Sequence, residues 1–140
     1  MASQNSTLIP HKSAINLIHN WTNEDIYIAL LMGYTPDPDI DDLFSTIQGS
    51  EITATSYPEG GIQLTNKTLD TSVSGQVKLR ANNVQFTDAA GDDSIIASAA
   101  VIYSHESGII LGTYEFGENA VADDGTLTFD FSNGILIVDY

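Results

Sequence analysis

Three aspartates at alternate positions are the residues whose spacing best fits metal chemistry. Asp37, Asp39 and Asp41 match the first three ligands of a calcium-binding loop. That motif also needs a glycine at its sixth position, where this chain has Asp42, and a glutamate at its twelfth, where it has a glutamine. The sequence therefore predicts a solvated acidic loop. A looser calcium site with oxygen ligands stays open, in this loop or at Asp88, Asp92 and Asp93.

Residues that could act as nucleophiles, bases or phosphate ligands do not occur in catalytic patterns. The chain has no cysteine, and its histidines lack the spacing of zinc ligands, lying at His11, His19 and His105. No Gly-x-Ser-x-Gly turn and no glycine-rich phosphate loop occurs in the sequence. We therefore expect no enzymatic activity, no catalytic residue, no metal centre and no cofactor.

The net charge of −15 limits the partners that this chain can bind. It has 19 acidic residues against four basic ones, Lys12, Lys67, Lys78 and Arg80. Nucleic acids and anionic lipids are bound chiefly through basic side chains, so we expect neither nucleic acid nor membrane as a partner. No apolar run of 18 residues occurs, and the polar N-terminal residues do not resemble a secretory signal. The charge suits a basic partner or a metal ion.

Length and composition predict one globular domain preceded by an arm. A chain of 140 residues, 42% of them hydrophobic, can form a core, unlike a disordered segment of low hydrophobicity. Residues 1–12 lack periodicity and are predicted as a flexible N-terminal arm, whereas residues 13–140 are predicted as a single β-rich domain. The piece at 13–21 fits a short helix or an opening strand. A helical turn is expected at 41–47, with Asp41 or Asp42 as its N-cap.

Hydrophobic alternation predicts strands over most of the remaining chain. The strand at 26–34 has apolar residues on both faces, so both faces should be covered. Further strands are expected at 51–57, 61–69, 77–81, 95–103, 109–116, 126–131 and 135–140. About eight short strands and one short helical segment predict a mainly β fold, built as an antiparallel β-sandwich or barrel.

Turn residues predict how these strands are joined. Proline and glycine residues at 58–61 should form a turn, and Asn82-Asn83 should form a bulge that moves the alternation to Val84 and Phe86. A loop is expected at Gly117, and Asn133-Gly134 indicates a hairpin. Aromatic residues fall mostly on strand-periodic positions and are expected in the core. Trp21 and Tyr57 adjoin polar turns, which makes them the aromatic candidates for a partner or ligand contact.

Several segments together resemble a group of small structural proteins in the virions of tailed bacteriophages, among them capsid cement or decoration proteins. They are "DIYIALLMGYTPDPD", "YPEGGIQLTNKTL", "VKLRANNVQF", "SAAVIYSHESGIILGTYEFG" and "NGILIVDY". The most particular pieces are the run Tyr57-x-x-Gly60-Gly61-x-x-Leu64 and the strand Val101-Ile102-Tyr103 followed by a glycine turn.

The resemblance implies a β-rich, non-enzymatic protein on the outer surface of a phage head. Its partner would be the major capsid protein, whose neighbouring capsomers it would clamp, and it would itself form a homo-oligomer, a dimer or a trimer. The acidic composition suits the outside of a shell, because the inside faces packaged DNA. Unpaired strand edges and an arm that orders on binding would suit such a role.

Two alternatives from other classes stay open. One is a head–tail connector or tail component of a phage. The other is a free-standing carbohydrate- or calcium-binding β-sandwich module, for which Trp21 beside Asn20, Asn23 and Asp25 is the candidate sugar site. Partner or self-interface contacts are predicted for the arm through Trp21, for the acidic loop 35–42 and for the last strand, 135–140. The named candidates are Trp21, Asp37, Asp39, Asp41, Asp42, Ile135, Ile137 and Tyr140.

Overall fold

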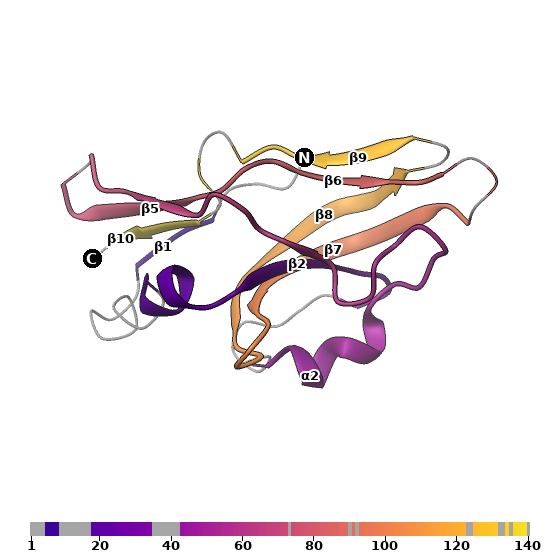
Figure 1. Cartoon of the computed structure of the whole chain (residues 1–140), viewed down its shortest axis with the longest axis horizontal. Helices are drawn as coiled ribbons and strands as arrows, with labels where there is room; N and C mark the ends of the chain where they lie inside the picture. The colour runs from indigo at the N-terminus through magenta and orange to yellow at the C-terminus, as the bar shows by residue number, and fades with distance from the viewer. Residues whose placement is uncertain are drawn as a thin grey trace.

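The structure is a computed structural model that describes residues 5–8, 18–34, 43–72, 74–89, 91, 93–122, 125–131, 134 and 136–139. These residues form a mainly β fold with antiparallel sheets, as the sequence predicts (Figure 1). The strands are β1 (Asn5–Leu8), β2 (Ile26–Leu31), β3 (Ile62–Gln63), β4 (Thr68–Asp70), β5 (Gln76–Arg80), β6 (Val84–Thr87), β7 (Ile95–Ser104), β8 (Ile110–Ala122), β9 (Thr126–Phe129) and β10 (Leu136–Asp139).

One antiparallel sheet, in the order β3-β2-β7-β8, forms the centre of the fold (Figure 1). Its strand β2 is almost completely buried, because one face packs in the larger core and the other in a smaller one. The prediction that both faces of this strand are covered is therefore confirmed. The strand ends at Leu31, however, so Met32 and Tyr34 lie beyond it and are exposed, contrary to the predicted extent of 26–34.

The remaining strands form two further open sheets, so the described strands do not close into a barrel. One has the order β1-β10-β5-β4, in which only the β1–β10 pair is parallel, and the other consists of β6 and β9. The predicted bulge at Asn82-Asn83 is instead the place where the chain leaves one sheet, after β5, and enters another at β6. The hairpin predicted around Gly134 is also wrong, because β9 and β10 belong to different sheets.

Two more predicted segments differ from the structure. Residues 52–57 form no strand, and only Glu51 makes a bridge, to Leu31. Strand β8 continues through the predicted loop at Gly117, where its pairing with β7 jumps from Ala97–Ala120 to Ala99–Glu115. The glycine therefore marks a bulge rather than the end of a strand.

Helical structure is confined to short pieces. Residues 18–23 are helical, which decides between the helix and strand alternatives for the segment before β2. The single turn α2 (Phe44–Ile47) lies where a helical turn is predicted and is followed by the 3₁₀ turn η1 (Gln48–Ser50). Its N-cap is Leu43 without a side-chain hydrogen bond, so the predicted capping by Asp41 or Asp42 is wrong.

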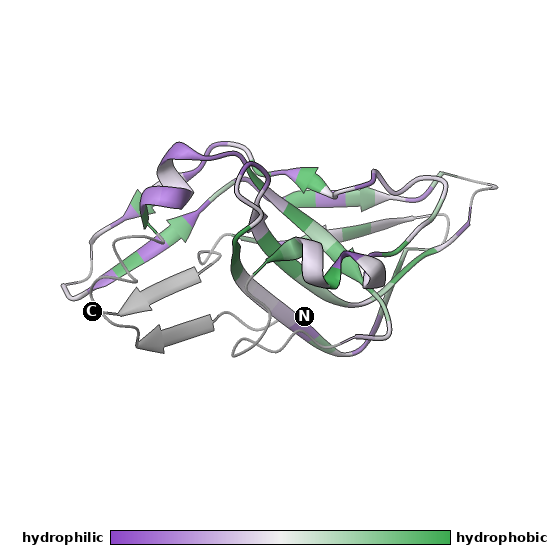
Figure 2. Ribbon diagram, turned by 90° about the horizontal axis from the view of Figure 1, so that it is seen from below, coloured by the Kyte–Doolittle hydropathy of each residue, from purple (hydrophilic) through white to green (hydrophobic). Residues whose placement is uncertain are grey.

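The two cores lie on opposite faces of the central sheet. The larger core joins that sheet to β5, β6 and β9, and its fully buried large side chains include Trp21, Leu64, Leu79 and Phe86. The smaller core lies under α2, where the rings of Phe44 and Tyr103 stack with their centroids 4.0 Å apart. Seen from below, α2 crosses the apolar strands of the central sheet (Figure 2). The sheet is thus covered on both faces along β2 and the part of β7 that pairs with it.

Candidate functional site

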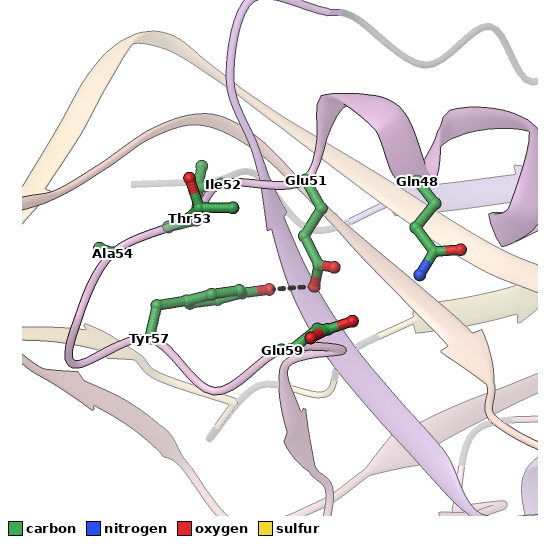
Figure 3. Close-up of a pocket in the computed structure, with 7 residues that line it drawn as sticks. All are labelled: Gln48, Glu51, Ile52, Thr53, Ala54, Tyr57 and Glu59. Carbon is green, nitrogen blue, oxygen red and sulfur yellow. Dashed lines mark hydrogen bonds between the residues drawn. The ribbon is translucent and has the colours of Figure 1, made fainter.

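The loop between η1 and β3, residues 51–61, surrounds a surface pocket of about 410 Å³. Figure 3 shows the carboxylates of Glu51 and Glu59 and the amide of Gln48 around this hollow, with the Tyr57 ring forming one wall. The other lining residues are Ile52, Thr53 and Ala54. None of the seven lining residues is basic, so the pocket is acidic.

The Tyr57 hydroxyl group connects the pocket to the central sheet. It accepts a hydrogen bond from the backbone N–H of Leu30, at 3.1 Å, and donates one to Oε2 of Glu51, at 2.6 Å. The same carboxylate oxygen accepts the backbone N–H of Gly60, at 2.9 Å. Through these hydrogen bonds Tyr57 attaches the loop to β2, and Glu51 holds Tyr57 and Gly60 in place.

Gly60 and Gly61 allow the loop to lie directly on the backbone of β2. The carbonyl of Gly60 accepts a 2.6 Å bond from the hydroxyl of Tyr103. Gly61 has a φ of +89°, and a Cβ atom there would lie 1.9 Å from the carbonyl oxygen of Ile28, so only glycine fits. Leu64 then enters the core, and its N–H donates to the carbonyl of Ile26 at 2.7 Å.

These contacts limit the chemistry available to the pocket. Burial, and then the bond to Glu51, raise the pKa of Tyr57 above its ordinary value, so the phenol stays protonated at neutral pH. One Glu51 oxygen already accepts two bonds from the loop. Tyr57 and one oxygen of Glu51 are therefore engaged in holding the loop, and the pocket offers a ligand the negative charge of its two carboxylates, Glu51 and Glu59.

Several sequence-predicted site residues fall outside the described residues: Asp37, Asp39, Asp41, Asp42, Asp92, Ile135 and Tyr140. Ile137 lies in β10, which pairs with β1 on one side and β5 on the other. In the second candidate calcium cluster, Asp88 is 3% exposed and Asp93 is exposed. Within the ranges that the structure describes, no three His, Cys, Asp or Glu residues are grouped so as to hold a metal ion.

Trp21 is 1% exposed and belongs to the larger core. Its indole N–H donates to the carbonyl of Thr68 at 3.3 Å, and the Lys67 ammonium lies 5.9 Å from its ring centroid. A sugar site would need an exposed ring beside the polar residues, so the carbohydrate candidate around Trp21 lacks its stacking surface in this fold. The Tyr57 ring is likewise buried, at 7% exposed.

Two of the four basic residues are engaged within the chain. The Lys67 ammonium donates to the carbonyl of Trp21, within the helical residues 18–23, and to that of Glu24, which directly follows them. Arg80 forms a salt bridge of 3.1 Å with Asp70. Hydrogen bonds from Ser72, and then the bond from Arg80, lower the pKa of Asp70 to about 2. Both cations thus serve contacts within the chain, whose net charge is −15.

A long sheet edge is the feature that sequence reasoning missed. Strand β8 has 13 residues and lies at the end of the central sheet, and no strand in the described part of the chain pairs with its outer edge. Apolar side chains are exposed beside it, with Val121 52% and its cross-strand neighbour Ile96 39% exposed. The uninterrupted length of β8 could not be predicted because Gly117 indicated a loop.

Comparison of the chain with family models, curated proteins and solved structures finds no match. No helix among the described residues is both long and apolar enough to span a bilayer. The proposals below therefore depend on the geometry of this chain and on the segment resemblance given above.

We expect Gly61→Ala to destabilise the fold strongly, because its Cβ would collide with the backbone of β2. The free energy of unfolding should fall by about 3 kcal/mol or more, measured by urea denaturation. Gly33→Ala is the matched control, since Gly33 also has a positive φ, +74°, but open space around it. It should lose only about 1 kcal/mol. Equal losses would contradict the close approach.

Tyr57→Phe should cost about 1–3 kcal/mol of unfolding free energy, because it leaves the buried N–H of Leu30 without its acceptor. Tyr27→Phe is the control, since the Tyr27 hydroxyl makes no hydrogen bond within the described chain, and it should change stability by less than about 0.5 kcal/mol. Thermal and urea unfolding measure both variants. Equal unfolding free energies for the two variants would show that the Tyr57 hydroxyl does not stabilise the fold.

Alkaline pH should destabilise the fold through its buried tyrosines. Burial raises the pKa of Tyr103 from 10.0 to about 12 and raises the pKa values of Tyr57 and Tyr114 as well. The unfolded chain therefore releases phenolic protons first, and folding stability falls as the pH rises from about 10 to about 12. Urea midpoints across this range measure the effect, and Tyr57→Phe should make the fall shallower. A flat profile would refute the assignment.

Proposed function

We propose that this chain is a non-enzymatic structural protein of a tailed-phage virion that decorates the outer surface of the head. In this role it binds the major capsid protein and clamps neighbouring capsomers. The observation that carries the proposal is the net charge of −15 on a mainly β fold that has exposed apolar side chains at Ile96 and Val121. A protein built in this way acts by association rather than by chemistry.

The charge distribution supports an exterior position. The chain carries a net charge of −15, and among its described basic side chains Lys67 binds backbone carbonyls and Arg80 pairs with Asp70. Packaged DNA would repel such a surface on the inside of a shell, whereas the outside imposes no such cost. Binding to the assembled lattice alone would stabilise that lattice by mass action.

The most particular part of the resemblance supports a likeness in fold. The run from Tyr57 to Leu64 places a hydroxyl group, two glycines and a leucine on the backbone of β2. A chain that keeps this run keeps the loop that completes one edge of the central sheet. The run therefore supports a fold shared with those phage proteins, and it does not identify the residues that bind a partner.

The test is cryo-electron microscopy of phage particles whose genome encodes this chain, beside particles from which its gene is deleted. Regular density over the capsid lattice should be present in the first and missing in the second. Heads that lack the protein should still assemble but should release DNA at a lower temperature, because the clamping contacts are lost.

Other outcomes would overturn the decoration role. Density confined to the portal vertex or tail would identify a connector or tail component. Absence from the particle would refute the virion assignment. In that case, a melting temperature that rises with calcium, or binding to a glycan array, would identify a free-standing module. The symmetry of the density would also show whether the protein is a dimer or a trimer.

A further inference from the structure

Two hollows of the surface adjoin one another along residues 51–54. The first is the acidic pocket described above, which has the Tyr57 ring as one wall. The second has a volume of about 350 Å³, and its lining includes Met32 and Ile96. All of residues 51–54 line both hollows. A partner that contacts this segment can therefore place one side chain in each hollow.

The acidic pocket contains hydrogen-bond acceptors that the fold does not use. Oε2 of Glu51 accepts bonds from Tyr57 and Gly60, which fixes the direction of the Glu51 side chain. Its other oxygen, the exposed carboxylate of Glu59 and the side-chain amide of Gln48 make no hydrogen bond to the described residues. These groups surround the same hollow (Figure 3). They can accept bonds from a donor that comes from outside the chain.

A lysine side chain is the donor that fits these acceptors. Its ammonium group carries three N–H bonds and can reach acceptors that belong to different side chains. Its apolar stem can lie on Ile52 and Ala54, which also line the pocket. Arginine binds best to both oxygens of one carboxylate, and one oxygen of Glu51 is already engaged. The pocket therefore favours an ammonium group.

The second hollow adds exposed apolar side chains to the surface. Met32 is 41% exposed and Ile96 is 39% exposed. Val121, which pairs with Ile96 across the sheet, is 52% exposed. None of the three belongs to the smaller core under α2. An apolar side chain of a partner would remove part of this area from water, which contributes affinity.

A second copy of the chain is a poor source of the lysine. Among the described basic residues, Lys67 binds backbone carbonyls, and Arg80 pairs with Asp70. Lys78 lies in β5, where Asp70 is also its cross-strand neighbour. Association of two copies would in addition bring together two net charges of −15. The charge of this surface is complementary to that of a basic segment from another protein.

We infer that residues 51–54 and their two hollows bind a segment of a partner protein in which a lysine lies close to an apolar residue. The lysine ammonium group enters the acidic pocket beside Glu51 and Glu59, and the apolar side chain packs on Met32 and Ile96. This inference rests on the proposed association with another protein, and it names the chemistry of the segment that is bound.

The experiment titrates the full chain with a short capped peptide in which one serine separates a leucine from a lysine. In NMR spectra, the amides of residues 51–54 and the methyl groups of Met32 and Ile96 should shift in one saturable titration. Norleucine in place of the lysine keeps an apolar stem but removes the charge, and should weaken binding about fivefold. Alanine in place of the leucine should also weaken binding about fivefold.

Variants of the chain separate a specific site from general attraction to an acidic protein. Glu59→Gln should weaken binding of the leucine–lysine peptide about threefold, because it removes one carboxylate from the pocket. Asp25→Asn removes the same charge from an exposed residue at the opposite end of β2 from Met32. It should weaken binding less than about 1.5-fold.

Four outcomes would overturn the inference. Equal weakening by Glu59→Gln and Asp25→Asn would show general electrostatic attraction. Equal affinity of the norleucine peptide would show that no ammonium group is recognised. Butylamine that binds as tightly as the peptide would identify a site for small amines instead of a docking surface. Shifts confined to residues outside the two hollows would place the peptide elsewhere.

The failure of this inference can be distinguished from failure of the proposed function. If the chain decorates phage heads while the peptide leaves residues 51–54 unchanged, only the lysine-docking inference is wrong. If the peptide binds as described but phage particles lack the chain, lysine docking is supported and the virion role is refuted.

Discussion

The hydrogen bond between the Tyr57 hydroxyl and the Leu30 N–H completes a strand on which the rest of the fold depends. β2 pairs along one edge with β7, but its other edge has no single strand beside it. That edge is assembled from pieces of the segment 50–64: backbone groups of residues 50–52, the Tyr57 hydroxyl, β3 and the N–H of Leu64. Because β2 is buried, every one of these partners replaces water that the strand cannot reach.

The same arrangement uses a tyrosine and a carboxylate of the pocket to support β2. A carboxylate in an acidic pocket is a candidate general base. One oxygen of Glu51, however, already accepts hydrogen bonds from two donors of the loop. Tyr57 is held protonated by burial and by that carboxylate.

The hydrophobic pattern alone could predict which segments form strands and which of their faces are buried. The mainly β class, the burial of β2 on both faces and the inward positions of Leu127 and Phe129 all follow from that pattern. It could not predict which sheet a strand joins, so the break between β5 and β6 was taken as a bulge. Apolar and polar residues also alternate over residues 52–57. The pattern could not show that this segment forms no strand and contacts β2 through the Tyr57 hydroxyl. The length of β8 could not be predicted for a related reason, since glycine at 117 indicates a turn whether or not the strand continues.

The assembly of β2 from distant segments has a kinetic consequence. The Tyr57–Leu30 bond joins residues 27 positions apart, and the bond from the Gly33 N–H to the Ser98 hydroxyl, beside the β2–β7 pairing, joins residues 65 apart. The entropic costs of closing these two loops differ by less than about 1 kcal/mol, so neither side of β2 is strongly favoured to form first. Folding of so non-local a topology belongs to the slow, millisecond-to-second range. Until both sides are in place, a strand that is apolar on both faces stays open to other chains, and aggregation competes with folding during that interval.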